Sequence, residues 1–245
     1  MDALKIKRSF DEDGYLHMPG FLTREQVAEI NQKLKAFIKS KISKLPSEHV
    51  RFEAKGDPST LKMLQDLQLY DTFFADILFD STFTRLAEVL LEEKVIGKTL
   101  EYFNKPPKIG KATPPHQDGY YFMLNPMSAV TMWMALEEVD QVNGWVSYVR
   151  GSHKKGMRDH SLTQTPGFSQ GIPDFGLPSD LEIEVFFPAQ PGDLLVHHAL
   201  TIHRASPNTS SKRSRKALGL IYFGDSVKED VAAKAAYVKA LNQSN

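Results

Sequence analysis

The sequence predicts a mainly β domain, built as a sandwich or barrel, with helices at both ends of the chain. Three observations lead to this prediction. Apolar side chains recur at helical spacing in the first part of the chain. From Lys94 onward, short runs rich in β-branched and aromatic residues alternate with clusters of Pro, Gly, Asn and Ser. A last segment rich in Ala and Lys indicates one more helix.

Residues 1–93 are expected to form a mostly helical N-terminal support. Thr23 and Gln26 have the spacing of a capping box, and apolar residues follow them near helical spacing. A second amphipathic helix is expected over residues 81–93. Between the two, residues 46–58 are expected to form a polar connection.

The central part of the chain, residues 94–226, is expected to form the β core. Strands are predicted at residues 95–103, 130–139, 145–149, 181–187, 194–200 and 216–223. Residues 161–179 contain several Gly and Pro, which predicts a long mobile loop or lid. Residues 227–245 are expected to be a C-terminal helix. No stretch has the composition of a linker, so residues 1–245 are expected to be a single domain.

Composition excludes several kinds of site and partner. The 30 basic and 30 acidic residues balance, so a dominant basic surface for nucleic acid is not indicated. The absence of cysteine excludes disulfides, thiolate metal sites and cysteine nucleophiles, which leaves His, Asp and Glu as metal ligands. Apolar runs are shorter than a membrane span needs, and the N-terminus lacks the apolar core of a secretory signal. A cytoplasmic protein without a membrane or nucleic-acid partner is therefore expected.

The strongest local motif is His116-Gln117-Asp118. On an extended strand, residues two apart point to the same face, so the imidazole and the carboxylate would converge. His203 follows the predicted strand over residues 194–200 and is a candidate third ligand. Two His and one carboxylate form the facial triad of non-haem Fe(II) oxygenases, which leaves open positions for a co-substrate and oxygen. An isolated HxD motif is more often a surface loop or a polar pair, so other residues must support this interpretation.

Arg215 is a candidate partner for a carboxylate, because the planar arginine fork binds carboxylates through two parallel hydrogen bonds. The alternative is a solvated charge within the basic residues 212–216. Arg213 lies two residues earlier and would share the same face of a strand. Alternation therefore does not decide between the two arginines.

Several short motifs follow one another in an order and at distances that are specific only when taken together. They are Asp13-Gly14-Tyr15, Pro19-Gly20-Phe21-Leu22, Asn104-Lys105-Pro106-Pro107, His116-Gln117-Asp118, Trp133, Asn143-Gly144, Gly151-Ser152-His153, Gly192-Asp193, Ile202-His203 and Arg215-Lys216-Ala217. This series resembles the phytanoyl-CoA hydroxylase family of Fe(II)- and 2-oxoglutarate-dependent dioxygenases over most of the chain. The chain has Arg150 where the family often has proline before the Gly-Ser-His segment.

The resemblance implies a double-stranded β-helix, which is a cupin-like jelly roll with helices packed outside. It also implies roles for individual residues. The iron ligands would be His116, Asp118 and His203. Arg215 would bind the far carboxylate of 2-oxoglutarate, and the Lys-Ala that follows it favours Arg215 over Arg213. Lys105 and Trp133 would line the co-substrate pocket.

Further residues are expected around this site. Thr131 lies two residues before Trp133 and would add a hydroxyl to the co-substrate pocket. Tyr120, Tyr121 and Met123 follow the His-Gln-Asp motif and are expected to face the substrate. One of His197 and His198 should point into the barrel, where it either lines the pocket or fills the core, and core packing is favoured.

The activity that the resemblance implies is hydroxylation of an unactivated C–H bond of a small molecule. The cofactors would be Fe(II), 2-oxoglutarate as co-substrate and O2, and the products would include succinate and CO2. Related halogenases have a small residue in place of the carboxylate, so Asp118 favours hydroxylation. The resemblance leaves the substrate open among acyl-CoA thioesters, osmolytes, phosphonates and natural products. It also leaves the oligomeric state open.

Three other functions use the same residues. The chain could be a non-catalytic cupin-like protein that binds a metal or a sugar, a 2-oxoglutarate sensor, or a zinc hydrolase. Arg215 together with Lys105 speaks against a simple binding module, and the intact triad speaks against a sensor. The ligand set alone does not choose between iron and zinc.

Overall fold

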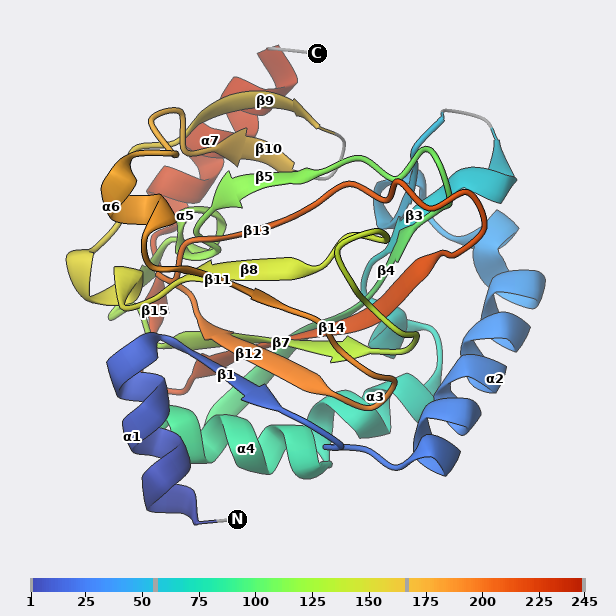
Figure 1. Ribbon diagram of the computed structural model, residues 1–245, viewed down its shortest axis with the longest axis horizontal. Helices are drawn as coiled ribbons and strands as arrows, with labels where there is room; N and C mark the ends of the chain where they lie inside the picture. Colours follow the sequence, from blue (N-terminus) through green and yellow to red (C-terminus); the bar gives the residue numbers. More distant parts are fainter. Residues whose placement is uncertain (1, 55–56, 166–167, 244–245) are drawn as a thin grey trace.

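The computed structural model describes residues 2–54, 57–165 and 168–243, which form two facing antiparallel sheets with helices outside them (Figure 1). The helices are α1 (Ala3–Asp13), α2 (Arg24–Lys41), α3 (Thr72–Phe79), α4 (Thr82–Leu91), α5 (Gly119–Phe122), α6 (Pro178–Leu181) and α7 (Val231–Gln243). The strands are β1 (Tyr15–Met18), β2 (Val50–Phe52), β3 (Leu61–Leu64), β4 (Val95–Lys105), β5 (Thr113–His116), β6 (Leu124–Asn125), β7 (Ala129–Ala135), β8 (Val146–Val149), β9 (Ser161–Thr165), β10 (Phe168–Gly171), β11 (Glu184–Phe187), β12 (Leu194–His198), β13 (His203–Ala205), β14 (Arg215–Gly224) and β15 (Lys228–Glu229).

The two sheets confirm the predicted double-stranded β-helix. The larger sheet has seven strands in the order β1-β12-β7-β14-β4-β3-β2, and the smaller has four in the order β11-β8-β13-β5. Two further pairs, β9 with β10 and β6 with β15, lie apart from these sheets. Because most neighbouring strands in the two sheets are not consecutive in the sequence, residues far apart in the chain meet on the facing surfaces.

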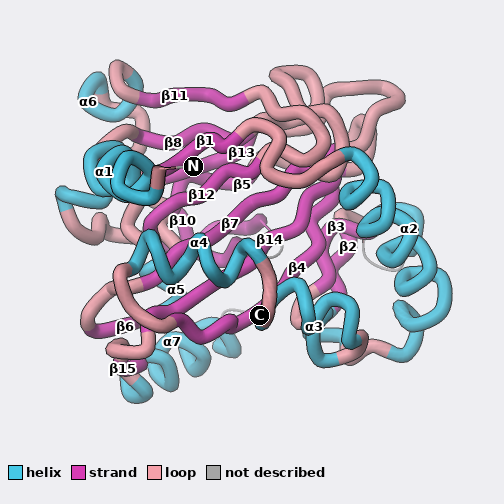
Figure 2. Tube along the Cα trace, turned by 90° about the horizontal axis from the view of Figure 1, so that it is seen from below, coloured by secondary structure: helices cyan, strands magenta, loops and turns pink. Residues whose placement is uncertain are grey.

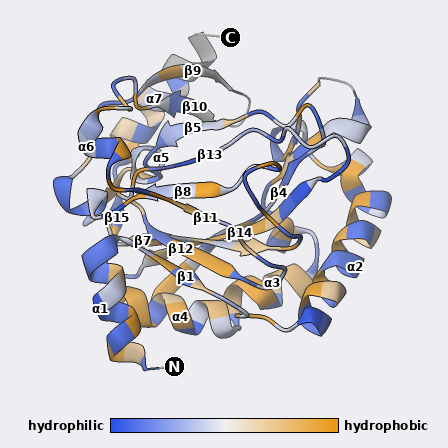
Figure 3. Ribbon diagram, viewed as in Figure 1, coloured by the Kyte–Doolittle hydropathy of each residue, from blue (hydrophilic) through white to orange (hydrophobic). Residues whose placement is uncertain are grey.

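The helices α2, α3 and α4 cover the outer face of the larger sheet, and α3 and α4 lie across its strands in Figure 2. Figure 3 colours much of α4 and of strand β12 as hydrophobic residues. Side chains alternate between the two faces of a strand. On β7, Met132 and Met134 pack into the core beneath the helices, whereas Thr131 and Trp133 point between the sheets. The inner face is thus free to carry the polar groups of a site.

The N-terminal part contains strands as well as the expected helices. Thr23 and Gln26 form the predicted capping box at the start of α2. However, β1 pairs with β12 and β3 pairs with β4, so both join the larger sheet. The strand β2 lies within residues 46–58, which corrects the expectation of a polar connection there. These strands have four residues or fewer, and pairing with longer neighbours stabilises them.

Residues 161–179 differ from the predicted loop. They contain the antiparallel pair of β9 and β10 and the start of α6. Pro166 and Gly167 lie outside the described residues. The strand predicted over residues 181–187 begins only at Glu184, because α6 extends to Leu181. None of the described helices combines the length and the apolar character that crossing a membrane requires.

Candidate active site

His116, Asp118 and His203 converge between the two sheets. His116 ends β5 and His203 begins β13, and the two residues are direct partners in the smaller sheet. Their Nε2 atoms lie 3.4 Å and 3.6 Å from Oδ1 of Asp118. Ligand atoms from the three residues all lie within 4.8 Å of one another. One ion can therefore be reached by all three side chains.

Asp118 reaches this position by a different route from the one the sequence predicts. The strand β5 ends at His116, and Asp118 has helical backbone angles (φ −59°, ψ −33°) at the N-cap of α5. The side chains of His116 and Asp118 converge because the chain turns, not because they alternate along one strand. The predicted reason is wrong, although the predicted convergence is present.

Backbone carbonyls orient both histidines for metal binding. The Nδ1 atom of His116 donates to the carbonyl oxygen of Pro114 at 2.8 Å, and Nδ1 of His203 donates to that of Thr201 at 3.0 Å. Since a carbonyl can only accept, the proton lies on Nδ1 and the lone pair lies on Nε2. Burial, with the charges of His197 and His116, lowers the pKa of His203 well below its usual value. The residues present fit Fe(II), which accepts two imidazoles and a carboxylate on one face.

The second carboxylate oxygen of Asp118 is held by two neighbours. Thr131 Oγ1 donates to Oδ2 at 2.5 Å, and His197 Nε2 donates to the same oxygen at 3.1 Å. The hydroxyl of Tyr148 lies 3.2 Å from Nδ1 of His197 and completes the chain of hydrogen bonds. These contacts fix the direction in which Oδ1 points. Thr131, expected in the co-substrate pocket, thus supports the metal ligand directly.

The same surroundings keep Asp118 ionised. Burial alone would raise its pKa, but the neighbouring imidazoles of His203, His116 and His197 hold the pKa of Asp118 well below its usual range. The sequence favoured core packing for whichever of His197 and His198 points into the barrel, and this role of His197 was missed. The signal is cross-strand register, since His197 of β12 lies opposite Thr131 of β7, and a single sequence does not reveal register.

Arg215 lies at the start of β14 with its side chain in the cavity between the sheets. It is only 3% exposed, and its Cζ atom lies 5.1 Å from the ring centre of Trp133. Its Nε atom is buried and has no hydrogen-bond partner among the described residues. Burial lowers the pKa of Arg215 to about 10, so the guanidinium is still charged at neutral pH. A buried cation with an unused donor is suited to a carboxylate ligand.

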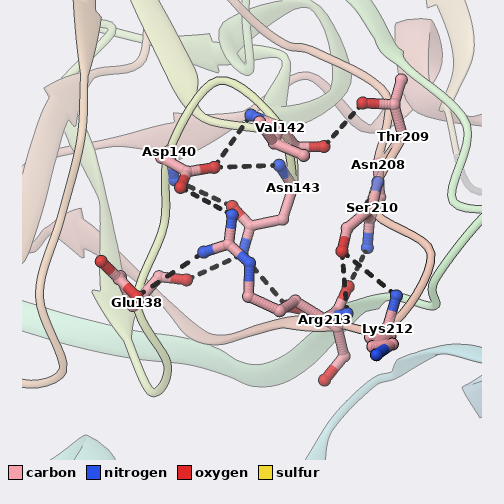
Figure 4. Close-up of polar contacts among 10 residues, drawn as sticks. Glu138, Asp140, Val142, Asn143, Asn208, Thr209, Ser210, Lys212 and Arg213 are labelled. Atoms are coloured by element: carbon pink, nitrogen blue, oxygen red, sulfur yellow. Dashed lines mark hydrogen bonds and ion pairs between the residues drawn. The ribbon is translucent and has the colours of Figure 1, made fainter.

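Arg213, the other candidate, points away from the cavity. Its guanidinium lies 2.6 Å from Oδ2 of Asp140 and 3.6 Å from Oε2 of Glu138, as Figure 4 shows. Asp140 also accepts hydrogen bonds from the backbone of Val142 and Asn143 within the same turn. Arg213 therefore stabilises a surface turn, and the geometry favours Arg215 as the co-substrate partner.

Lys105 lies directly opposite Arg215 in the pairing of β4 with β14. Its ammonium donates to three backbone carbonyls, those of Lys111 at 2.8 Å, Ala205 at 3.3 Å and Ser206 at 2.7 Å. An ammonium has three hydrogens, so these contacts use all of them. Burial, followed by the charge of Arg215, lowers the pKa of Lys105 well below its usual value. Lys105 lines the cavity as expected, but its ammonium holds the surrounding loops.

The cavity has a volume of about 630 Å³ and reaches from Arg215 past the three ligands. Its aromatic lining consists of Phe103, Tyr121, Phe122, Trp133, Tyr148 and Phe223. Of the residues expected to face the substrate, Tyr121 lines the cavity and donates to the carbonyl of Gln170 at 2.9 Å. Tyr120 instead stacks on His160, with ring centres 4.3 Å apart. Met123 ends α5 with φ 53°, and neither it nor Tyr120 is among the described residues that line the cavity.

Comparisons with known proteins agree with this site. The model of the family described as "Phytanoyl-CoA dioxygenase (PhyH)" matches residues 10–217. A 1-deoxypentalenic acid 11-beta-hydroxylase of Streptomyces arenae is 29% identical over 228 residues, which covers 85% of this chain and 76% of the relative. The phytanoyl-CoA dioxygenase of Arabidopsis thaliana is 26% identical, with 86% of this chain and 85% of the relative covered.

Solved structures show the same fold at lower sequence identity. The epimerase SnoN, in complex with Fe3+, alpha ketoglutarate and nogalamycin RO, superposes with a TM-score of 0.73 at 24% identity, covering 93% of this chain and 85% of the other. EctD from S. alaskensis, with 2-oxoglutarate and 5-hydroxyectoine, has a TM-score of 0.73 at 19% identity, covering 90% and 76%. The family match extends over most of the chain and includes His116, Asp118 and His203. The chain belongs to the phytanoyl-CoA dioxygenase family, and it is an Fe(II)- and 2-oxoglutarate-dependent oxygenase.

Proposed function

We propose that this oxygenase hydroxylates an unactivated C–H bond of a small molecule while 2-oxoglutarate is converted to succinate and CO2. The observation that carries the proposal is the complete His116, Asp118 and His203 triad at the wall of a cavity that is also lined by Arg215. Asp118 occupies the position that a small residue has in related halogenases, which supports hydroxylation. Relatives named as a hydroxylase and as dioxygenases point in the same direction.

Each residue has a defined task in this proposal. Bound Fe(II), with 2-oxoglutarate and O2, supplies the oxidising power for the C–H bond. His116 and His203 present Nε2 because their Nδ1 protons are held by carbonyls. Arg215 binds the far carboxylate of 2-oxoglutarate, with the indole of Trp133 against its guanidinium. The aromatic walls exclude water and orient the substrate.

We also infer that residues 1–93, 94–226 and 227–245 act as one domain. Strands β1, β2 and β3 come from the first of these parts and belong to the same sheet as β4, β7, β12 and β14. The cytoplasmic location stays a prediction from the sequence.

Anaerobic reconstitution with Fe(II) and 2-oxoglutarate tests the proposal. The wild-type protein should develop the weak visible charge-transfer band of a chelated 2-oxo acid. The band should disappear in His116→Ala and weaken in Arg215→Ala. Arg213→Ala is the matched control, because this arginine is tied to the turn at Asp140, and it should leave the band unchanged.

A second stage tests the reaction itself. Under oxygen, the wild-type protein should form succinate slowly on its own and faster with a substrate that is then hydroxylated. Absence of the band together with tight zinc binding would contradict the oxygenase assignment and favour a hydrolase or a binding protein. Succinate formation with a halogenated or rearranged product would contradict hydroxylation but not the oxygenase assignment.

A further inference from the structure

We propose that Glu101 determines substrate specificity by binding a protonated nitrogen of the substrate inside the cavity. The inference rests on the proposed function, because it concerns the substrate of the same site. The expected substrates are small molecules that combine a cationic nitrogen with an apolar body, because these two parts match the residues of the cavity wall.

Glu101 lies on the inner face of the larger sheet. It is directly opposite Gly219 of β14, and Gly219 is opposite Trp133 of β7. The three residues form one row across the sheet, and Glu101 lines the same cavity as the triad. Its exposed fraction is only 8%. A molecule that enters the cavity can therefore meet this carboxyl group away from bulk water.

Glu101 lacks the cationic partner that other buried carboxylates have. Glu53 lies 3.3 Å from the ammonium of Lys62, and Glu184 lies 2.6 Å from the guanidinium of Arg204. Within the described part of the chain, Glu101 forms no ion pair, and its hydrogen-bond partner is the side-chain amide of Gln65 at 3.0 Å. Buried carboxylates are normally paired, so an unpaired one that faces a cavity indicates a ligand.

Three of the basic side chains that line the cavity have partners elsewhere. Lys98 and Lys234 both bind Glu229, each at 2.8 Å, at the edge of the cavity next to α7. Lys105 donates to three carbonyls, as described above. None of these cations can move to Glu101 without breaking an existing contact. The missing positive charge is therefore best supplied by the substrate.

The surrounding charges explain why a cation is preferred to an anion. Burial, with the charges of Asp118 and Asp66, raises the pKa of Glu101 to about 7. An anionic group at this place would be repelled by the same carboxylates, so 2-oxoglutarate is directed toward Arg215 instead. A substrate ammonium would form a charge-assisted hydrogen bond, which is about twice as strong as a neutral one. Ile221, Phe122 and Phe223 supply the apolar surface for the rest of the molecule.

Binding to the metal-free protein tests the inference separately from turnover. The probes are alkyl- and cycloalkylamines, each matched with the alcohol of the same carbon skeleton, and the readouts are calorimetric titration and thermal shift. Wild-type protein should bind the amines in preference to the alcohols. Glu101→Gln keeps an acceptor for Gln65 and should weaken amine binding about tenfold or more, as expected for the loss of one charged hydrogen bond. Glu137→Gln removes a charge that pairs with Lys216 outside the cavity and should change nothing.

Two outcomes would overturn the inference. Amines might bind wild-type and Glu101→Gln protein equally well, or wild-type protein might fail to prefer them over alcohols. The charge-transfer band of Fe(II) and 2-oxoglutarate, measured on the same proteins, distinguishes this failure from failure of the oxygenase proposal. Glu101→Gln should retain that band, whereas a wild-type protein without it would contradict the proposed function instead.

Discussion

Two buried carboxyl groups in one cavity differ because of their immediate neighbours. Asp118 has three imidazoles around it, and its pKa is held well below the usual range despite its burial. Glu101 has an amide and two other carboxylates, and burial raises its pKa to about 7. The first is therefore a permanent anion suited to a metal, whereas the second changes charge near neutral pH.

The raised pKa of Glu101 predicts a loss of stability with rising pH in the metal-free protein. Its carboxyl group has a pKa of 4.5 before folding and about 7 after folding, so the folded state binds more protons between these values. The free energy of unfolding should therefore fall by about 3 kcal/mol as the pH rises from roughly 4.5 to 7. Urea unfolding at several pH values measures this change, and Glu101→Gln should remove it.

The pH dependence of wild-type stability must be compared with that of Glu101→Gln, because His198 also contributes to it. Burial lowers its pKa to about 4, so its contribution is present above pH 6.5 and is lost as the pH falls toward 4. This change opposes that of Glu101 over part of the same range. The difference between wild type and Glu101→Gln cancels it, and identical pH dependence in both proteins would contradict the assignment.

The hydrogen bonds to Asp118 predict a measurable loss of metal affinity when they are removed. His197→Phe and Thr131→Val each take one donor from Oδ2 and allow the carboxylate to turn. Such outer contacts typically contribute about 10- to 100-fold to metal affinity. Titration with Fe(II) under anaerobic conditions checks this. His198→Gln changes a side chain that packs on Phe10, so it should bind Fe(II) as wild type does.

At the scale of elements, strands with a local apolar pattern were predictable, whereas several short strands of the N-terminal part were not. The segments that became β4, β12 and β14 are apolar runs with turn residues around them, and both features are visible in the sequence. β1 and β3 are stabilised by pairing with β12 and β4, which are distant in the chain, and β2 is the edge strand that pairs with β3. A local pattern does not contain that information. The same limit explains why 161–179 was expected to be a loop.

The candidate site was predictable in its ligands and not in its supporting contacts. The resemblance identified His116, Asp118, His203 and Arg215, because these residues belong to motifs with fixed order. The tasks of His197, Thr131 and Lys105 depend on which strands are adjacent and in which register. The choice between Arg215 and Arg213 depends on the position of Asp140, which comes from another part of the chain.

Close packing between Gly219 of β14 and Phe103 of β4 makes a prediction about stability. A Cβ atom at this position would lie 2.5 Å from Cε2 of Phe103, so the ring would have to move into the cavity. Gly219→Ala should destabilise the protein by about 1–3 kcal/mol, the usual cost of overpacking. Gly20→Ala is the contrast, because a Cβ there meets nothing within 4 Å and the cost comes from its φ of 62°. A urea unfolding midpoint of Gly219→Ala equal to that of the wild-type protein would contradict this packing.

At the scale of the whole molecule, one cavity is lined by side chains of both charges. Arg215, Lys62 and Lys105 are buried, and burial lowers the pKa of each. The charge of Arg215 lowers the pKa values of Lys62 and Lys105 further. Glu101 and Asp66 line the same cavity. A dicarboxylate at Arg215 and a cationic group at Glu101 would thus bind different side chains of one cavity, and strand β4 carries both Lys105 and Glu101.

The burial of the Arg215 guanidinium predicts how the stability of the whole protein depends on 2-oxoglutarate. Without a ligand, its charge is poorly compensated, so Arg215→Met should leave the metal-free protein as stable as wild type or more stable. With metal bound, 2-oxoglutarate at about a hundredfold excess over its Kd should stabilise wild type by about 2.7 kcal/mol. That gain should be much smaller in Arg215→Met and unchanged in Arg213→Ala. Anaerobic thermal unfolding measures both effects. An equal gain from 2-oxoglutarate in Arg215→Met would mean that the far carboxylate binds elsewhere.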